Sequence, residues 1–169
     1  MTATYPPPTQ SSVVSAYDRL GEILRALNDE SVAYVLFRGQ AVNAHGILRY
    51  TGGIDLFVDP TPENVNRLRC ALRRVWPDPE IDEIVVEDLA GDYAVVRYGT
   101  PDDFVIDLTG RVGDAFSFAD IESETLIVAG VAARVATARM LYRMKKDTVR
   151  PHDRADAAEL KRKFRIDED

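Results

Sequence analysis

Cysteine and histidine are scarce in this sequence of 169 residues, which contains one cysteine, Cys70, and two histidines, His45 and His152. One cysteine excludes a disulfide framework within the chain, and a reducing cytosol suits such a sequence. Two histidines exclude a histidine-rich zinc site. No serine–histidine–aspartate or cysteine–histidine arrangement is indicated, and the G-x-x-x-x-G-K-[ST] motif of a phosphate loop is absent from the sequence.

Long apolar runs and an excess of basic residues are also lacking. No apolar run reaches the roughly 20 residues that span a bilayer, and no signal-peptide hydrophobic region follows Met1. We therefore expect a cytoplasmic protein without membrane contacts. The formal net charge of -7 argues against a broadly basic surface for nucleic acid, although arginine and lysine are concentrated in residues 134–165. The hydrophobic fraction of 46% is that of an ordinary globular protein.

Hydrophobic periodicity and turn residues predict the order of the secondary structure elements. Residues 1–12 contain three consecutive prolines and are predicted to form a disordered leader, followed by a single domain over residues 13–169. The predicted helices are 13–27, 41–46, 62–75, 136–147 and 151–164, and the predicted strands are 34–37, 54–58, 84–86, 93–98, 104–108, 125–128 and 131–135. This order predicts an α+β fold, in which helices flank a mixed sheet and the chain ends in a helical pair.

Two aspartates interrupt strands that are otherwise apolar. Asp55 follows Ile54 in GIDLFV, and Asp107 lies in FVIDL. A buried carboxylate costs several kcal/mol unless a metal, an ion partner or hydrogen bonds compensate it. Acids on neighbouring strands can share Mg²⁺, which prefers oxygen ligands. The alternative is that each acid pairs with an arginine, of which the chain has many.

Two further segments have phosphate-binding character. In KKDTVRPHDRAD, which begins at Lys145, cationic side chains could hold a polyphosphate with Asp153 orienting them. The alternative is a solvated, salt-bridged helical hairpin. The turn formed by residues 38–40, at the start of a predicted helix, could present backbone N–H groups to a phosphate, although a single glycine there is a weak signal.

Taken together, these residues resemble the minimal nucleotidyltransferase superfamily, and more closely its abortive-infection type, which includes toxins of toxin–antitoxin pairs. That family has a strand ending in a glycine pair, a short helix, an Arg-x-Thr loop, and Asp-x-Asp opening the next strand. The corresponding region here reads LFRGQAVNAHGILRYTGGIDLFV. A third acid on a later strand corresponds to Asp107, and the helical lysine and Arg-x-x-Asp-x-x-Asp motif correspond to LYRMKKDTVRPHDRADAAEL. The resemblance covers residues 17–164.

The resemblance implies Mg²⁺-dependent transfer of a nucleoside monophosphate from a nucleoside triphosphate to a hydroxyl of RNA, such as a tRNA end, or of a protein. Pyrophosphate would be released, and a cognate antitoxin or target protein is a further expected partner. The residues implied as catalytic are Asp55, Asp107 and Lys145, with Asp55 and Asp107 as the metal ligands. Those implied to bind the nucleotide are Arg38, Gly39, Gln40, Arg49, Thr51, Lys145, Arg150 and Asp153.

The sequence departs from this family pattern at two positions. Gly53 stands where the first acid of Asp-x-Asp is expected, and Arg38 stands where the first glycine of the turn is expected. Loss of one carboxylate from a two-metal site costs orders of magnitude in rate. Three interpretations remain open: a weakened enzyme, a degenerate member that binds a nucleotide, nucleic acid or protein, and an active enzyme whose natural residue 53 has been replaced.

Overall fold

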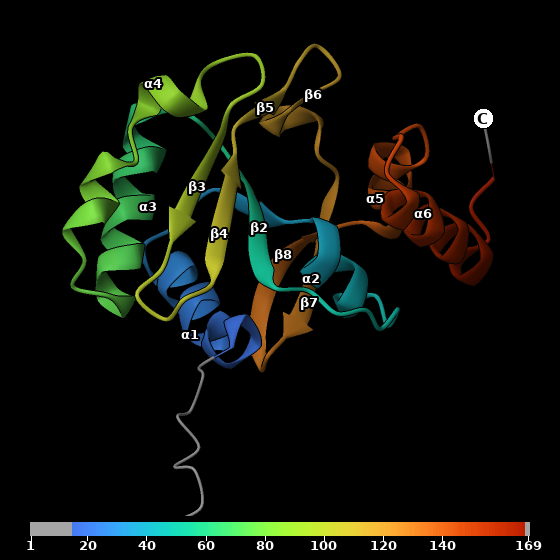
Figure 1. The fold of residues 1–169 in the computed structure, drawn as a ribbon, viewed down its shortest axis with the longest axis horizontal. Coiled ribbons are helices and arrows are strands. Elements are labelled where there is room, and N and C mark those ends of the chain that lie inside the picture. Colours follow the sequence, from blue (N-terminus) through green and yellow to red (C-terminus); the bar gives the residue numbers. More distant parts are fainter. Residues whose placement is uncertain (1–14, 168–169) are drawn as a thin grey trace, which may run out of the picture.

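The computed structural model describes residues 15–167, and the predicted disordered leader lies outside this part of the chain. Its centre is a mixed six-stranded sheet with the strand order β3-β4-β2-β1-β8-β7 (Figure 1). The pairs β2–β4 and β1–β8 are parallel, and the other neighbours are antiparallel. The structure confirms the α+β class, with a mixed sheet flanked by helices.

The elements have the following bounds. The strands of the large sheet are β1 Tyr34–Leu36, β2 Gly53–Val58, β3 Val95–Gly99, β4 Val105–Thr109, β7 Ser123–Val128 and β8 Val131–Ala136. The two-stranded sheet consists of β5 Arg111–Val112 and β6 Phe116–Ser117. The α-helices are α1 Ala16–Asp29, α2 Arg38–Ala44, α3 Pro62–Val75, α4 Val86–Leu89, α5 Ala138–Lys145 and α6 Pro151–Phe164, and the 3₁₀ helices are η1 Pro79–Glu83 and η2 Phe118–Asp120.

Three sequence predictions need correction. The strand predicted at 84–86 is wrong, because Ile84 and Val85 only link η1 to α4, which begins at Val86. Ile81, Ile84 and Leu89 bury their side chains from this segment. The helix predicted at 41–46 begins earlier, at Arg38. The helix predicted at 136–147 begins at Ala138, since residue 136 still pairs within the β7–β8 hairpin.

The core lies between the sheet and its helices, and it fixes which strand residues face the candidate site. In β2 and β4, Ile54, Leu56, Ile106 and Leu108 are fully or almost fully buried. Because successive strand residues point to opposite faces, the residues between them share the other face. Helices α1 and α3 lie side by side, and the α5–α6 pair stands at the opposite end of the molecule (Figure 1).

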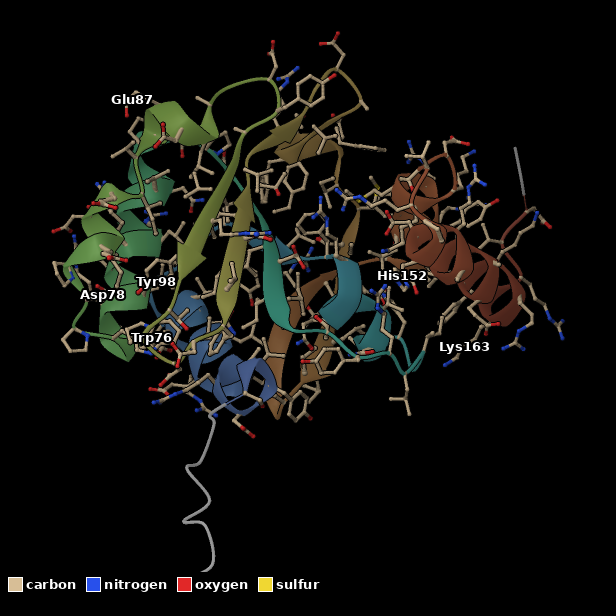
Figure 2. All side chains as sticks on the ribbon, in the orientation of Figure 1. Trp76, Asp78, Glu87, Tyr98, His152 and Lys163 are labelled. Atoms are coloured by element: carbon tan, nitrogen blue, oxygen red, sulfur yellow. The ribbon has the colours of Figure 1, made fainter. Side chains whose placement is uncertain are left out.

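A cluster of polar contacts lies near the end of α3, far from the α5–α6 pair. The indole Nε1 of Trp76 donates to Asp102 at 2.9 Å, and the hydroxyl of Tyr98 donates to Asp78 at 2.6 Å. Figure 2 shows Trp76, Asp78 and Tyr98 together near α3, well separated from His152 on α6. Burial, followed by the bond to Asp78, raises the pKa of Tyr98. These contacts tie the β3–β4 hairpin to the segment after α3, which is a structural role.

Between residues 15 and 167, no helix is both long enough and apolar enough to cross a bilayer.

Candidate functional site

Asp55 and Asp107 lie directly opposite each other on the parallel strands β2 and β4. Each carboxylate has an arginine partner. Nη1 of Arg38 is 3.6 Å from Oδ1 of Asp55, and Arg97 donates to both carboxylate oxygens of Asp107 at 2.9 and 3.1 Å. The structure therefore contains the alternative that the sequence left open, in which an arginine accompanies each acid.

Arg38 reaches Asp55 from an unusual backbone conformation. It begins α2 with φ of 59°, in the left-handed region, where a residue other than glycine is strained by roughly 1–2 kcal/mol. Its guanidinium lies 5.1 Å from the centroid of the Phe37 ring, a cation–π distance. The position that suits glycine sterically thus carries a cation held over an aromatic ring beside a carboxylate.

Gly39 and Gln40, predicted to form a phosphate turn, are buried. A Cβ atom on Gly39 would lie 3.0 Å from Cβ and Oγ1 of Thr51, so this glycine allows close packing against the Arg-x-Thr loop. The Gln40 amide and the Thr51 hydroxyl both donate to the carbonyl of Gly53, at 3.3 and 3.1 Å. At this turn, the group directed toward Asp55 is the Arg38 side chain.

Gly53 also sits where space is restricted. A Cβ atom at this position would approach the carbonyl oxygen of Val105 to 2.7 Å, closer than ordinary packing allows. An aspartate could enter only if the backbone of β2 or β4 moved. The spacing between β2 and β4 therefore leaves no room at position 53 for the first acid of the motif.

Lys145 is the centre of a buried ion network at the α5–α6 junction. Only 4% of the residue is exposed, and its ammonium donates to Asp153 at 3.1 Å and to Asp156 at 3.2 Å. Arg49 forms an ion pair with Asp156, which attaches the Arg-x-Thr loop to α6. Burial opposes ionisation of Asp153, but the hydrogen bond and charge of Lys145 outweigh it and lower the pKa of that carboxyl. The expected salt-bridged hairpin is present, but its ion pairs are shielded from solvent.

Eight of the ten predicted site residues line one of two cavities, which the ion pair between Arg38 and Asp55 links. A cavity of about 450 Å³ has Arg38, Lys145, Arg150 and Asp153 in its wall, together with the apolar side chains Phe37, Val112, Phe116, Leu141, Met144 and Val149. A second cavity, of about 340 Å³, is lined by Arg49, Thr51, Asp55 and Asp107 among others. Gly39 packs against Thr51, and Gln40 lines a further cavity beside Arg49 and Thr51.

Arg97 is the functional candidate that sequence reasoning missed. It is the only charged residue in β3, and its Cα partner is Asp107. The signal was present in YAVVRYG, where one arginine interrupts a β-prone run. Only the strand register, which the sequence does not specify, reveals which acid it meets.

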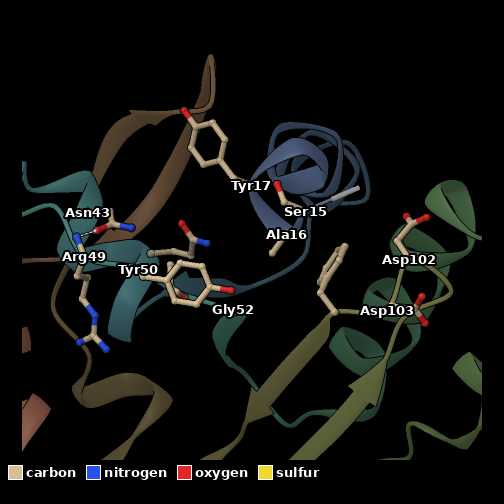
Figure 3. Close-up of a pocket in the computed structure, with 12 residues that line it drawn as sticks. Ser15, Ala16, Tyr17, Asn43, Arg49, Tyr50, Gly52, Asp102 and Asp103 are labelled. Carbon is tan, nitrogen blue, oxygen red and sulfur yellow. Dashed lines mark hydrogen bonds between the residues drawn. The ribbon is translucent and has the colours of Figure 1, made fainter. Parts of the chain in front are cut away.

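A third cavity, of about 370 Å³, adjoins this region. Residues 49–52 line both it and the cavity containing the two aspartates. Figure 3 shows Tyr17 of α1 and Tyr50 of the loop before β2 around it, with Asp102 and Asp103 across from them. Both tyrosines are exposed, Tyr17 to 63% and Tyr50 to 91%. This cavity therefore offers aromatic surface next to the cavity that contains Asp55 and Asp107.

The environment of Asp55 leads to a pH prediction. Burial raises the pKa of its carboxyl, Asp107 adds to this effect, and Arg38 opposes it. The folded state therefore holds the proton more tightly than the unfolded chain, whose aspartate pKa is about 3.9. The stability contributed by protonated Asp55 is lost as the pH rises from about 3.9, the pKa in the unfolded chain, through the raised pKa of Asp55 in the folded state. We expect Asp55→Asn to melt above the wild type at neutral pH, with the difference vanishing below about pH 3.9.

Thermal melting of both proteins across this pH range tests the point. A lower melting temperature of Asp55→Asn at neutral pH would instead make the carboxylate a stabilising partner of Arg38.

The residues fit a two-metal centre poorly. Mg²⁺, which the family resemblance implies, requires several oxygen ligands, and here two carboxylates share their face of the sheet with two guanidinium groups. In the described part of the chain, no cluster of three or more histidine, cysteine, aspartate or glutamate side chains is placed to hold a metal ion.

The sheet order, the opposed aspartates and the C-terminal helical pair define a nucleotidyltransferase-like fold, and comparison with solved structures supports it. The Thermotoga maritima protein TM1012, a proposed nucleotidyltransferase, aligns over 86% of this chain and 89% of its own, with a TM-score of 0.51 and 16% identity. The aminoglycoside nucleotidyltransferase ANT(2")-Ia, solved with adenylyl-2"-tobramycin, aligns over 86% and 87%, with a TM-score of 0.56 and 16% identity. At such identity the likeness concerns the fold. No family model and no curated protein matches the sequence.

Proposed function

We propose that this chain is a nucleoside-triphosphate-binding protein of the nucleotidyltransferase fold in which transfer chemistry is strongly weakened. The observation that carries the proposal is the cavity beside the Arg38–Asp55 ion pair. Its wall combines an apolar side with three cations, Arg38, Lys145 and Arg150, and two acids, Asp147 and Asp153. Its volume of about 450 Å³ falls in the range of small-molecule sites. A nucleotide has the complementary character, with a flat apolar base and a polyanionic tail.

The cations of this cavity differ in how free they are to bind phosphate. Lys145 already donates to two aspartates, so its charge is largely neutralised. Arg150, the residue before α6, is exposed, and the Arg38 side chain is 40% exposed. Guanidinium groups bind phosphate oxygens through paired N–H donors. Arg38 and Arg150 are therefore the proposed phosphate ligands, and Lys145 holds the two helices together behind them.

Weak nucleotidyl transfer is the second candidate function. The fold neighbour ANT(2")-Ia was solved with an adenylylated molecule, and the cavity with Tyr17 and Tyr50 adjoins the two aspartates. We propose that an acceptor would lie there and that its hydroxyl would release its proton to solvent and attack the α-phosphorus. The bond between the α-phosphorus and the oxygen that bridges to the β-phosphate would break, and pyrophosphate would leave. Only the sequence resemblance supports an RNA or protein hydroxyl as the acceptor and an antitoxin as a partner.

Calorimetric titration with each of the four nucleoside triphosphates, with Mg²⁺ present, tests the binding proposal. At least one nucleotide is expected to bind. Arg150→Ala should weaken that affinity about tenfold, since one charge-assisted hydrogen bond is removed. Arg162→Ala is the matched control: it removes the same charge from α6, where Arg162 pairs with Glu159 on the surface, and should leave affinity unchanged. Absence of binding by all four nucleotides would contradict the proposed function.

A further inference from the structure

We infer that the site accepts the triphosphate of a nucleotide without a divalent metal ion, because Arg38 and Arg97 neutralise the two acids and keep guanidinium surface exposed for phosphate oxygens. This inference rests on the proposed function, since it concerns the same site. It goes further in assigning Arg97 to ligand binding and in separating nucleotide affinity from Mg²⁺.

The charges around the two aspartates are balanced. Asp55 and Asp107 contribute two negative charges, and Arg38 and Arg97 contribute two positive charges within 3.6 Å of them. The cluster is therefore formally neutral, whereas a site of three carboxylates would carry three negative charges. A neutral cluster attracts a divalent cation weakly, because the two guanidinium groups must first be displaced from the oxygens that the metal would use.

The missing first acid of Asp-x-Asp cannot readily be supplied at position 53. A side chain at Gly53 would collide with the Val105 carbonyl at 2.7 Å. Both remaining carboxylates are largely shielded from solvent, with side-chain exposures of 18% for Asp55 and 16% for Asp107. Their most direct partners are the arginines, so these two acids serve to position cations.

The guanidinium groups of Arg38 and Arg97 are accessible to a ligand. The Arg97 side chain is 73% exposed and the Arg38 side chain 40% exposed, although each has a shielded aspartate partner. One side of each guanidinium is thus anchored, and the remainder faces solvent. Arg97 lines the cavity that contains both aspartates, and Arg38 lines the larger cavity with Arg150. A polyphosphate extending between the two cavities would meet both groups.

The test is titration of the protein with ATP in excess EDTA and, separately, in excess Mg²⁺, together with titration of Mg²⁺ alone. We expect the two ATP dissociation constants to agree within about threefold, and we expect no Mg²⁺ binding in the submillimolar range. In EDTA, Arg38→Gln and Arg97→Gln should each weaken ATP binding at least about tenfold. Arg67→Gln, which alters a surface pair with Glu63, is the control and should have no effect.

The outcomes separate this inference from the proposed function. ATP binding that requires Mg²⁺, or unchanged affinity in both arginine variants, would overturn the metal-free site and leave nucleotide binding intact. No ATP binding in either condition, together with none by the other nucleoside triphosphates, would overturn both. Circular dichroism of the variants distinguishes lost contacts from lost folding.

Discussion

Replacing Lys145 with methionine is expected to lower the free energy of unfolding by about 3–5 kcal/mol, which is the usual cost of removing one partner from a buried ion network. The ammonium is the shared partner of Asp153 and Asp156, and the side-chain exposures are 5% for Lys145 and 10% for Asp156. Without it, Asp153 loses its ion partner in this network, although Thr148 still donates to it at 3.1 Å.

Urea denaturation at neutral pH measures this loss, and its dependence on pH tests the cause. The difference between wild type and Lys145→Met should shrink below about pH 4, where aspartates take up protons. Arg162→Ala, which breaks an exposed pair on the same helix, should change stability by less than about 0.5 kcal/mol. A loss of under about 1 kcal/mol for Lys145→Met would contradict the assigned role of the buried network.

The second large effect is expected at Gly53. Gly53→Ala should lower the free energy of unfolding by about 1–3 kcal/mol, because the added methyl group meets the Val105 carbonyl and forces β2 and β4 apart. The chain provides a matched control in Gly99, which also pairs with Val105, from the other side of β4. No atom lies within 4 Å of a Cβ built there, so Gly99→Ala should be neutral or slightly stabilising.

Thermal and urea unfolding of the two alanine variants decide the point. Equal effects at the two positions would mean that β2 and β4 adjust easily, and that an aspartate at position 53 is compatible with the fold. Under the expected result, Gly53→Asp fails as a simple repair of catalysis, because it disturbs the strand pair that holds Asp55 opposite Asp107.

Much of the fold was predictable from local signals. Alternating apolar residues identified β2 and β4, and the predicted helices 62–75 and 151–164 match the bounds of α3 and α6, each of which begins at a proline. The strand predicted at 84–86 failed because a short run of β-branched residues is compatible with strand and helical turns alike. In the structure η1 ends at Glu83 and α4 begins at Val86, and Ile84 is buried from the link between them.

The candidate site was predictable as a set of residues but not as a set of contacts. Asp55 and Asp107 stood out because each is an acid in an apolar strand, a property of sequence alone. Whether each meets a metal or an arginine depends on strand register and on the direction of side chains from other elements. Arg97 became a candidate only when β3 was seen to pair with β4 in register, and the buried position of Lys145 depends on how α5 packs on α6.

The most direct test of the account is a crystal structure of the full chain with a non-hydrolysable ATP analogue in the absence of divalent metal. We expect phosphate oxygens within hydrogen-bond distance of Arg38 and Arg97, and the base against the apolar wall formed by Phe37 and Leu141. A triphosphate bound elsewhere, such as on the outer surface of α6, would contradict the assigned site, and crystals that bind no analogue at saturating concentration would contradict nucleotide binding itself.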